Sequence, residues 1–104
     1  MTVAVIDGRD VHVDTEGFLT NPTEWDEVLA QTLASNIGID LTDRHWSAIR
    51  FARSDHVATG ETPTLRRMAA AGEVPTKEMF ALFPKKPAKK LAYVAGLPKP
   101  VGCV

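Results

Sequence analysis

Prolines and glycines recur at short intervals along this chain of 104 residues, and they restrict it to short elements of secondary structure. Gly38, Gly60 and Gly96 each follow a segment whose apolar residues have helical spacing. Glycine ends helices readily, and a proline inside a helix removes a donor and clashes with the preceding turn. No repeat and no long linker divides the chain. We therefore expect one domain over residues 1–96 and an irregular arm over residues 97–104.

The first fourteen residues predict a β-hairpin over residues 3–13. Two short runs rich in valine, residues 3–6 and 9–13, flank the pair Asp7-Gly8. An Asp-Gly pair in that setting favours a type I′ turn, because both of its central residues need a positive φ.

Five helices are predicted after the hairpin, from cap residues, from proline at the first helical position and from apolar residues at helical spacing. Asn21-Pro22, Thr42, Thr62-Pro63 and Thr76 supply the start signals. The expected fold class is mainly α with a small N-terminal β-hairpin (α+β), as a compact bundle of about five short helices with a flexible C-terminal arm. The expected helices cover about residues 22–35, 42–59, 63–71, 76–83 and 87–95.

The chain contains a single cysteine, Cys103, and 44% of its residues are hydrophobic. At this length folding buries about 60–70% of the surface of the chain, so no disulfide scaffold is needed. One cysteine excludes an internal disulfide, a cysteine-based zinc finger and a CxxC redox pair. The sequence has neither a signal peptide nor an apolar run that could span a membrane. We expect a soluble, cytoplasmic protein.

Charge is distributed unevenly along the chain, although the net charge is −1. Residues 1–43 hold nine acidic residues and one basic residue, whereas residues 44–104 hold eleven basic residues and four acidic residues. The last 26 residues hold five lysines and no acid. A solvated face is the simplest explanation. The alternative is a surface that steers an acidic partner or RNA toward the tail.

Cys103 is the candidate reactive group, since a thiolate attacks sulfane sulfur, disulfides and electrophilic carbon. It is the penultimate residue, on a tail that begins after Gly96. Pro98 and Pro100 stiffen that tail toward an extended shape and so lower the entropy lost when it enters a partner. Gly102 leaves room beside the sulfur. The alternative is an unused terminal cysteine on a disordered tail.

The tail over residues 93–104, which reads YVAGLPKPVGCV, resembles the C-terminus of the DsrC/TusE family of sulfur-relay proteins. Further matches extend the resemblance over almost the whole chain: Gly17-Phe18-Leu19, Trp25, Leu41-Thr42 to Trp46, Arg53, Pro63, Arg66, Leu82-Phe83-Pro84 and Pro87. The resemblance implies a small, mostly helical fold with an N-terminal β-hairpin and a mobile C-terminal arm. It also implies that Cys103 is the cysteine that carries sulfur as a persulfide.

One position departs from the family members that take part in sulfite reduction. Those members carry a second cysteine eleven residues before the penultimate one, where this chain has Ala92. Without a second thiol, a persulfide on Cys103 can leave only by attack from another molecule. The chain therefore resembles the single-cysteine, TusE-like form, a sulfurtransferase that acts as a stoichiometric carrier.

For that form the resemblance implies the thiolation of the wobble uridine of tRNA. The expected sulfur donor is a TusBCD/DsrEFH-like complex, and the expected acceptor is a tRNA 2-thiouridylase or a sulfite-reductase-type complex. A DsrC-like role in sulfur oxidation, in sulfite metabolism or in its regulation stays open. No cofactor, metal or membrane is expected, and direct binding of nucleic acid is disfavoured.

Besides Cys103, five residues are candidates for contacts with the arm, the sulfur or a partner. Lys99, Pro100 and Gly102 belong to the arm itself. Arg53 and Arg66 match the family, and a guanidinium could hold the terminal carboxylate or a persulfide anion. Ordinary surface pairing of these arginines is the alternative.

The remaining candidates are weaker. His12, His45 and His56 lack the spacing of metal ligands, which favours structural or surface roles. Trp25 and Trp46 are expected in the core. Residues 42–71 could also form a helix-turn-helix that binds DNA, with Arg66 and Arg67 at the start of its second helix. A net charge near zero gives that alternative little electrostatic support.

Overall fold

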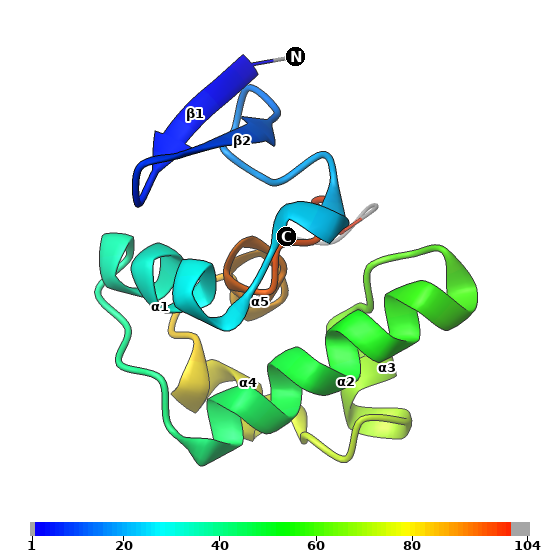
Figure 1. Ribbon diagram of the computed structural model, residues 1–104. Helices are drawn as coiled ribbons and strands as arrows, with labels where there is room; N and C mark the ends of the chain where they lie inside the picture. Colours follow the sequence, from blue (N-terminus) through cyan, green and yellow to red (C-terminus); the bar gives the residue numbers. More distant parts are fainter. Residues whose placement is uncertain (1, 101–104) are drawn as a thin grey trace.

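The N-terminal hairpin caps one side of a group of helices that surround a central C-terminal helix (Figure 1). This computed structural model describes residues 2–100. Those residues confirm the mainly α architecture with an N-terminal β-hairpin. Their elements are β1 (Thr2–Ile6), β2 (Arg9–Val13), the 3-10 turn η1 (Pro22–Glu24), α1 (Glu27–Asn36), α2 (Asp43–Thr59), α3 (Leu65–Ala70), α4 (Thr76–Leu82) and α5 (Pro87–Val94).

The hairpin forms as the Asp-Gly pair predicts. β1 and β2 are antiparallel with Ile6 opposite Arg9, which leaves Asp7 and Gly8 as the two turn residues. Their φ values, +53° and +74°, are both positive, as a type I′ turn requires. Val11 and Val13 of β2 are buried and pack against α1. The hairpin is thereby fixed to the helices through one face.

The prediction of a helix over 22–35 is wrong at its start, because an extended segment separates η1 (Pro22–Glu24) from α1. Trp25 has an extended backbone, with φ −81° and ψ 144°. Asp26 then caps α1, since its carboxylate accepts a 2.8 Å hydrogen bond from the backbone N–H of Leu29. The Asn-Pro signal at residue 21 is real, but it starts only one 3-10 turn. The long helix therefore begins at Glu27.

α2 begins at the predicted cap, and a histidine of α2 forms a hydrogen bond with α4. The Thr42 backbone N–H donates to Nδ1 of His45 at 3.0 Å, as in a capping box. Nδ1 is therefore an acceptor, and the opposite nitrogen of His45, Nε2, donates to the Leu82 carbonyl at 2.7 Å. His45 is buried. Its role is structural, as the missing metal-ligand spacing favours.

α3 is shorter than predicted. Thr64, rather than Thr62, caps it by accepting a hydrogen bond from the Arg67 backbone N–H at 3.2 Å. The helix expected over 63–71 thus covers Leu65–Ala70. The hydroxyl of Thr62 is used elsewhere, as described below.

The core gathers around α5. Leu91, Ala92, Val94, Ala95 and Leu97 are all at most 1% exposed. α1, α2 and α4 pack around this helix (Figure 1). Within residues 2–100, no helix is both long enough and apolar enough to cross a membrane. Because α5 is central, the segment that follows it starts from the middle of the core.

Candidate functional site

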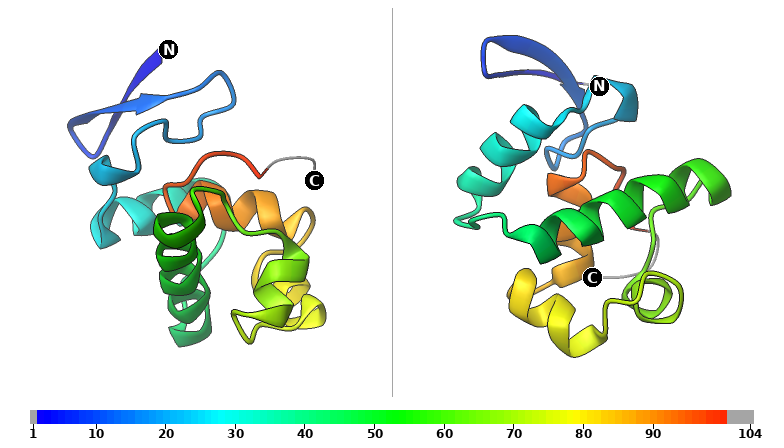
Figure 2. Two further views of the ribbon diagram at one scale, coloured as in Figure 1. Left: turned by 90° about the vertical axis from the view of Figure 1, so that its right-hand side faces the viewer. Right: turned by 60° about the horizontal axis from the view of Figure 1, so that its bottom comes forward.

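The arm root, defined here as residues 96–100, is the part of the C-terminal arm that the structure describes. Cys103 and Gly102 lie outside the described residues. The arm root runs between the hairpin side of the molecule and the helices (Figure 2). It leaves α5 at Gly96, whose φ is +69°. The mobility expected for residues 97–104 stays a prediction, but residues 97–100 make specific contacts with the body.

Backbone hydrogen bonds shape the turn at the end of α5. The Leu97 N–H donates to the Ala92 carbonyl at 3.0 Å, and the Gly96 N–H donates to the Tyr93 carbonyl at 3.4 Å. This is a Schellman turn, in which the residue after the last helical turn takes a positive φ. Leu97 is then 1% exposed and acts as a buried anchor for the arm.

Side chains from two other elements bind the next carbonyls. Trp25 donates from its indole nitrogen to the Val94 carbonyl at 2.9 Å. Arg53 donates to the Ala95 carbonyl at 2.8 Å from Nη1 and to the Pro22 carbonyl at 3.0 Å from Nη2. Together with the turn, these donors satisfy all four carbonyls of residues 92–95, so the direction in which the arm leaves the core is fixed.

The guanidinium of Arg53 lies over the Trp25 ring, with its central carbon 4.1 Å from the ring centre. This is within the range of a cation–π contact. Burial lowers the pKa of the Arg53 guanidinium, yet an arginine remains protonated at neutral pH. Within residues 2–100, Arg53 therefore positions the base of the arm. A contact of Arg53 with sulfur stays a prediction.

Replacing Arg53 by alanine should lower the free energy of unfolding by about 2 kcal/mol, because two hydrogen bonds from a charged group and the contact with Trp25 are lost. Thermal unfolding measures this loss. Arg50→Ala is the matched control, since Arg50 lies on the same helix, is exposed and makes only weak contacts. Its ion pair with Glu27 is 3.9 Å long, and its guanidinium carbon lies 6.0 Å from the centre of the Trp46 ring, at the outer limit of a cation–π contact. An equal loss in both variants would contradict the role of Arg53 at the arm root.

The outer part of the arm root is held by two further contacts. The Thr62 hydroxyl donates to the Pro98 carbonyl at 2.6 Å. The Lys99 ammonium lies 3.0 Å from a carboxylate oxygen of Glu16. Pro100 is buried. The predicted arm residues Lys99 and Pro100 therefore lie against the body.

Glu16 is placed between two lysines, Lys99 and Lys89, whose ammonium groups lie 3.0 and 3.3 Å from its carboxylate. Their hydrogen bonds, that of Lys99 first, lower the pKa of Glu16 from its ordinary value of 4.5. A carboxyl whose pKa is lowered by a contact stabilises that contact while it is ionised. Glu16 thus connects the arm to α5 at neutral pH.

Acid should therefore release Lys99 from Glu16. The contact contributes fully above the ordinary pKa of Glu16, near 4.5, and is lost as the pH falls through the lowered value. Amide chemical shifts of Leu97 and Lys99, followed by NMR from neutral to acidic pH, measure the release. Glu16→Gln should abolish the transition, whereas Glu61→Gln, at another exposed acid, should leave it in place. The same transition in Glu16→Gln would show that another group titrates.

Arg66, the second arginine that the sequence singled out, does not reach the arm root. It is exposed and, among residues 2–100, it makes no ion pair or side-chain hydrogen bond. Its neighbour Arg67 instead pairs with the buried Asp55, at 2.8 Å from Nη2 and 3.1 Å from Nε. Asp55 raises the pKa of Arg67. This pairing occupies an arginine that the DNA-binding alternative needs for contacts with bases.

The sequence does not predict three of the residues that hold the base of the arm and the arm root. The sequence places Trp25 simply in the core and Thr62 at a helix cap, and Glu16 carries no signal. Trp25 and Arg53 are both among the residues that match the family, and this shared match could have indicated that they contact each other. Glu16 and Lys99 are 83 positions apart, so no local pattern joins them.

Comparisons with known proteins find similar sequences and folds over nearly the whole chain. A family model described as "DsrC like protein" matches residues 5–104. "Sulfurtransferase TusE" of Escherichia coli K12 is 37% identical over 107 residues, covering 96% of this chain and 98% of that protein. The NMR structure of Allochromatium vinosum DsrC is 33% identical, with a TM-score of 0.81, and the match covers 98% of this chain and 97% of that one. A crystal structure of dissimilatory sulfite reductase I contains a chain that is 31% identical, with a TM-score of 0.84, at coverages of 99% and 100%.

Proposed function

This chain belongs to the family of DsrC-like proteins, and from that membership we propose that Cys103 carries sulfane sulfur from one protein to another. The chain is a sulfur-relay carrier, like the sulfurtransferase that it matches over nearly its whole length. The observation that supports Cys103 as the carrier residue is that the sequence has no other cysteine. It is the only thiol in the sequence, and it lies within the residues that the family model matches.

The transfer needs two thiol exchanges and no net oxidation. In the first, the Cys103 thiolate attacks the outer sulfur of a donor persulfide, the sulfur–sulfur bond of the donor breaks, and the donor leaves as a thiolate. Cys103 then holds the sulfur as a persulfide. In the second exchange, an acceptor thiolate attacks that outer sulfur, and the Cys103 thiolate leaves. Each step forms one sulfur–sulfur bond and breaks one.

The position of Ala92 supports delivery to another molecule. Ala92 is fully buried in α5, and its carbonyl accepts the hydrogen bond from Leu97 that shapes the arm root. Since no second thiol exists in the chain, the persulfide cannot be closed into an internal disulfide. The acceptor must supply the second thiol.

Sulfur-relay partners follow from the family in general. As particular partners we propose a TusBCD/DsrEFH-like donor and, as acceptor, a tRNA 2-thiouridylase of the kind that the TusE-like form implies. A free thiol also favours a reducing compartment such as the cytoplasm. A DsrC-like role in sulfite metabolism is the second candidate, and no contact within residues 2–100 favours it.

Mass spectrometry of the protein and of its C-terminal peptide tests the role of Cys103. The protein is incubated with a cysteine desulfurase and cysteine, then cleaved after Lys90 to release the peptide 91–104. We expect a gain of one sulfur atom, located on that peptide and lost on treatment with a reductant. Protein alkylated beforehand is the control. No gain with any donor, or sulfur on a different peptide, would overturn the proposal.

A further inference from the structure

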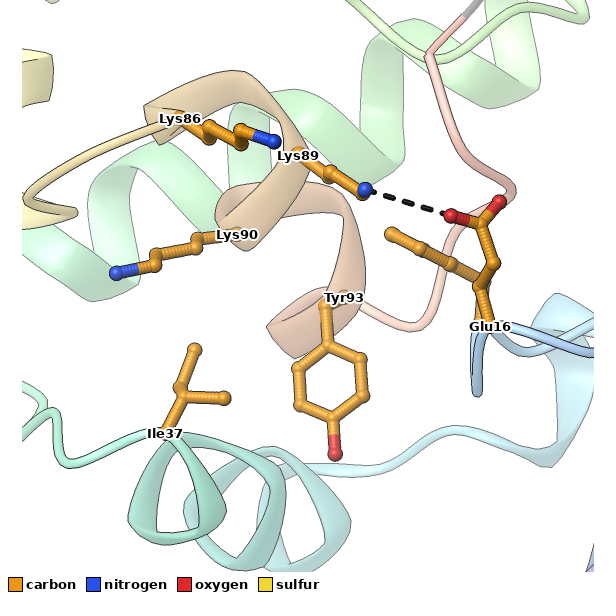
Figure 3. A pocket seen from close by; sticks show the side chains of 7 residues that line it. Glu16, Ile37, Lys86, Lys89, Lys90 and Tyr93 are labelled. Carbon is orange, nitrogen blue, oxygen red and sulfur yellow. Dashed lines mark ion pairs between the residues drawn. The ribbon is translucent and has the colours of Figure 1, made fainter. Parts of the chain in front are cut away.

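A cavity of about 350 Å³ opens to the surface beside α5, and no part of the carrier chemistry above uses it. It lies between α5, the end of α1 and the loop after β2 (Figure 3). Its apolar wall consists of Phe18, Ile37 and Tyr93. The rings of Phe18 and Tyr93 meet edge to face at 6.1 Å, so this wall is well packed.

The rim of the cavity has an excess of positive charge. Lys86, Lys89 and Lys90 come from α5 and the residue before it, and Glu16 is the one acid among the lining residues that the structure describes (Figure 3). Glu16 is already shared between Lys89 and Lys99. Lys86 is exposed and has no acidic partner within residues 2–100. The lining residues therefore include three lysines and one carboxylate, and the Lys90 ammonium is already bound to the Pro84 carbonyl.

The combination of an apolar wall and a cationic rim selects the kind of ligand. If the lysines only formed a solvated face, they would not need an apolar cavity beside them. RNA is bound largely by stacking of bases on exposed aromatic rings, but Phe18 is only 3% exposed and its ring packs against Tyr93. A peptide with one apolar side chain and neighbouring carboxylates complements both parts of the cavity.

The cavity also adjoins the base of the arm. Glu16 lines it and also pairs with Lys99 of the arm root. A protein held here would lie next to the segment that leads to Cys103. Binding at this place would raise the effective concentration of the partner near the arm.

We propose that this cavity docks an acidic segment of a protein partner. An aliphatic or aromatic side chain of that segment lies against the half-buried Ile37 and Tyr93, and its carboxylates pair with Lys86 and Lys89. Only the description of the partner as a sulfur-relay protein rests on the proposed function.

Fluorescence anisotropy tests the docking with a defined probe, a fluorescein-labelled decapeptide of glutamates around a central leucine. Lys86→Glu should weaken its binding at least about tenfold, because an attractive charge becomes a repulsive one. Lys77→Glu is the matched control, an exposed lysine on α4 with the same change of charge, and it should change binding less than about twofold. A peptide with serine in place of leucine should bind more weakly to the unchanged protein.

The other outcomes overturn the proposal. They are no binding of the peptide to the unchanged protein, equal weakening by both variants, or tighter binding of a labelled single-stranded RNA of the same length. Sulfur uptake by Cys103, measured by mass, is a separate readout. Uptake without docking overturns the docking proposal alone, and docking without uptake overturns only the proposed function.

Discussion

Replacing Cys103 by serine should abolish sulfur transfer while leaving the fold intact. A serine hydroxyl has the shape of the thiol but is hardly ionised at neutral pH, so it does not attack a persulfide. We expect sulfur uptake from a protein donor to fall at least about 100-fold, to background, in single-turnover assays with radiolabelled sulfur.

The stability of the Cys103→Ser variant separates chemistry from structure. The core and the arm root described above are built entirely from residues 2–100. The free energy of unfolding should therefore change by less than about 0.5 kcal/mol. A variant that still accepts sulfur at the normal rate would remove Cys103 from the mechanism, and a large loss of stability would give it a structural role instead.

The parts of the fold that local chemistry determines were predicted well. Asp7-Gly8 fixes its hairpin because both turn residues need a positive φ. Thr42 and Gly60 start and end α2 with a cap and a left-handed residue. In both cases neighbouring residues supply all the contacts that decide the structure.

Predictions failed where a distant contact overrides the local signal. Trp25 has helical neighbours, but its ring is held by Arg53 and by the Val94 carbonyl, and the chain is extended there. Thr62 and Thr64 flank the same proline, and the sequence cannot tell which of them caps α3. The structure assigns Thr64 to the cap and Thr62 to Pro98 of the arm root.

The sequence predicts only the reactive end of the candidate site, where Cys103 stays a prediction, and it does not predict the contacts at the base of the arm. The single cysteine and the amino-acid sequence of the tail identify residues 97–104 as the candidate site without any structure. The support of the arm comes from Glu16, Thr62 and Arg53, on three different segments. Such contacts depend on how α5 is packed in the core, which no spacing along the chain encodes.

Gly96→Ala should destabilise the protein more than the same change at any other helix-ending glycine. Gly96 has a φ of +69°, and a Cβ there would overlap the Trp25 ring, with Trp25 Cβ and Cγ at 2.7 Å. Trp25 cannot move away freely, because its indole binds the Val94 carbonyl and Arg53 covers its ring. The clash therefore adds about 1–3 kcal/mol of overpacking to a backbone cost of about 1–2 kcal/mol.

Gly60→Ala is the matched control for this prediction. Gly60 ends α2 with a φ of +78°, and nothing lies within 4 Å of the position that its Cβ would take. It should therefore lose only the backbone part, about 1–2 kcal/mol. The melting temperature of Gly96→Ala should then lie about 5–20 °C below that of Gly60→Ala. Equal melting temperatures would mean that Trp25 does not hold the end of α5, and the arm root would need a different support.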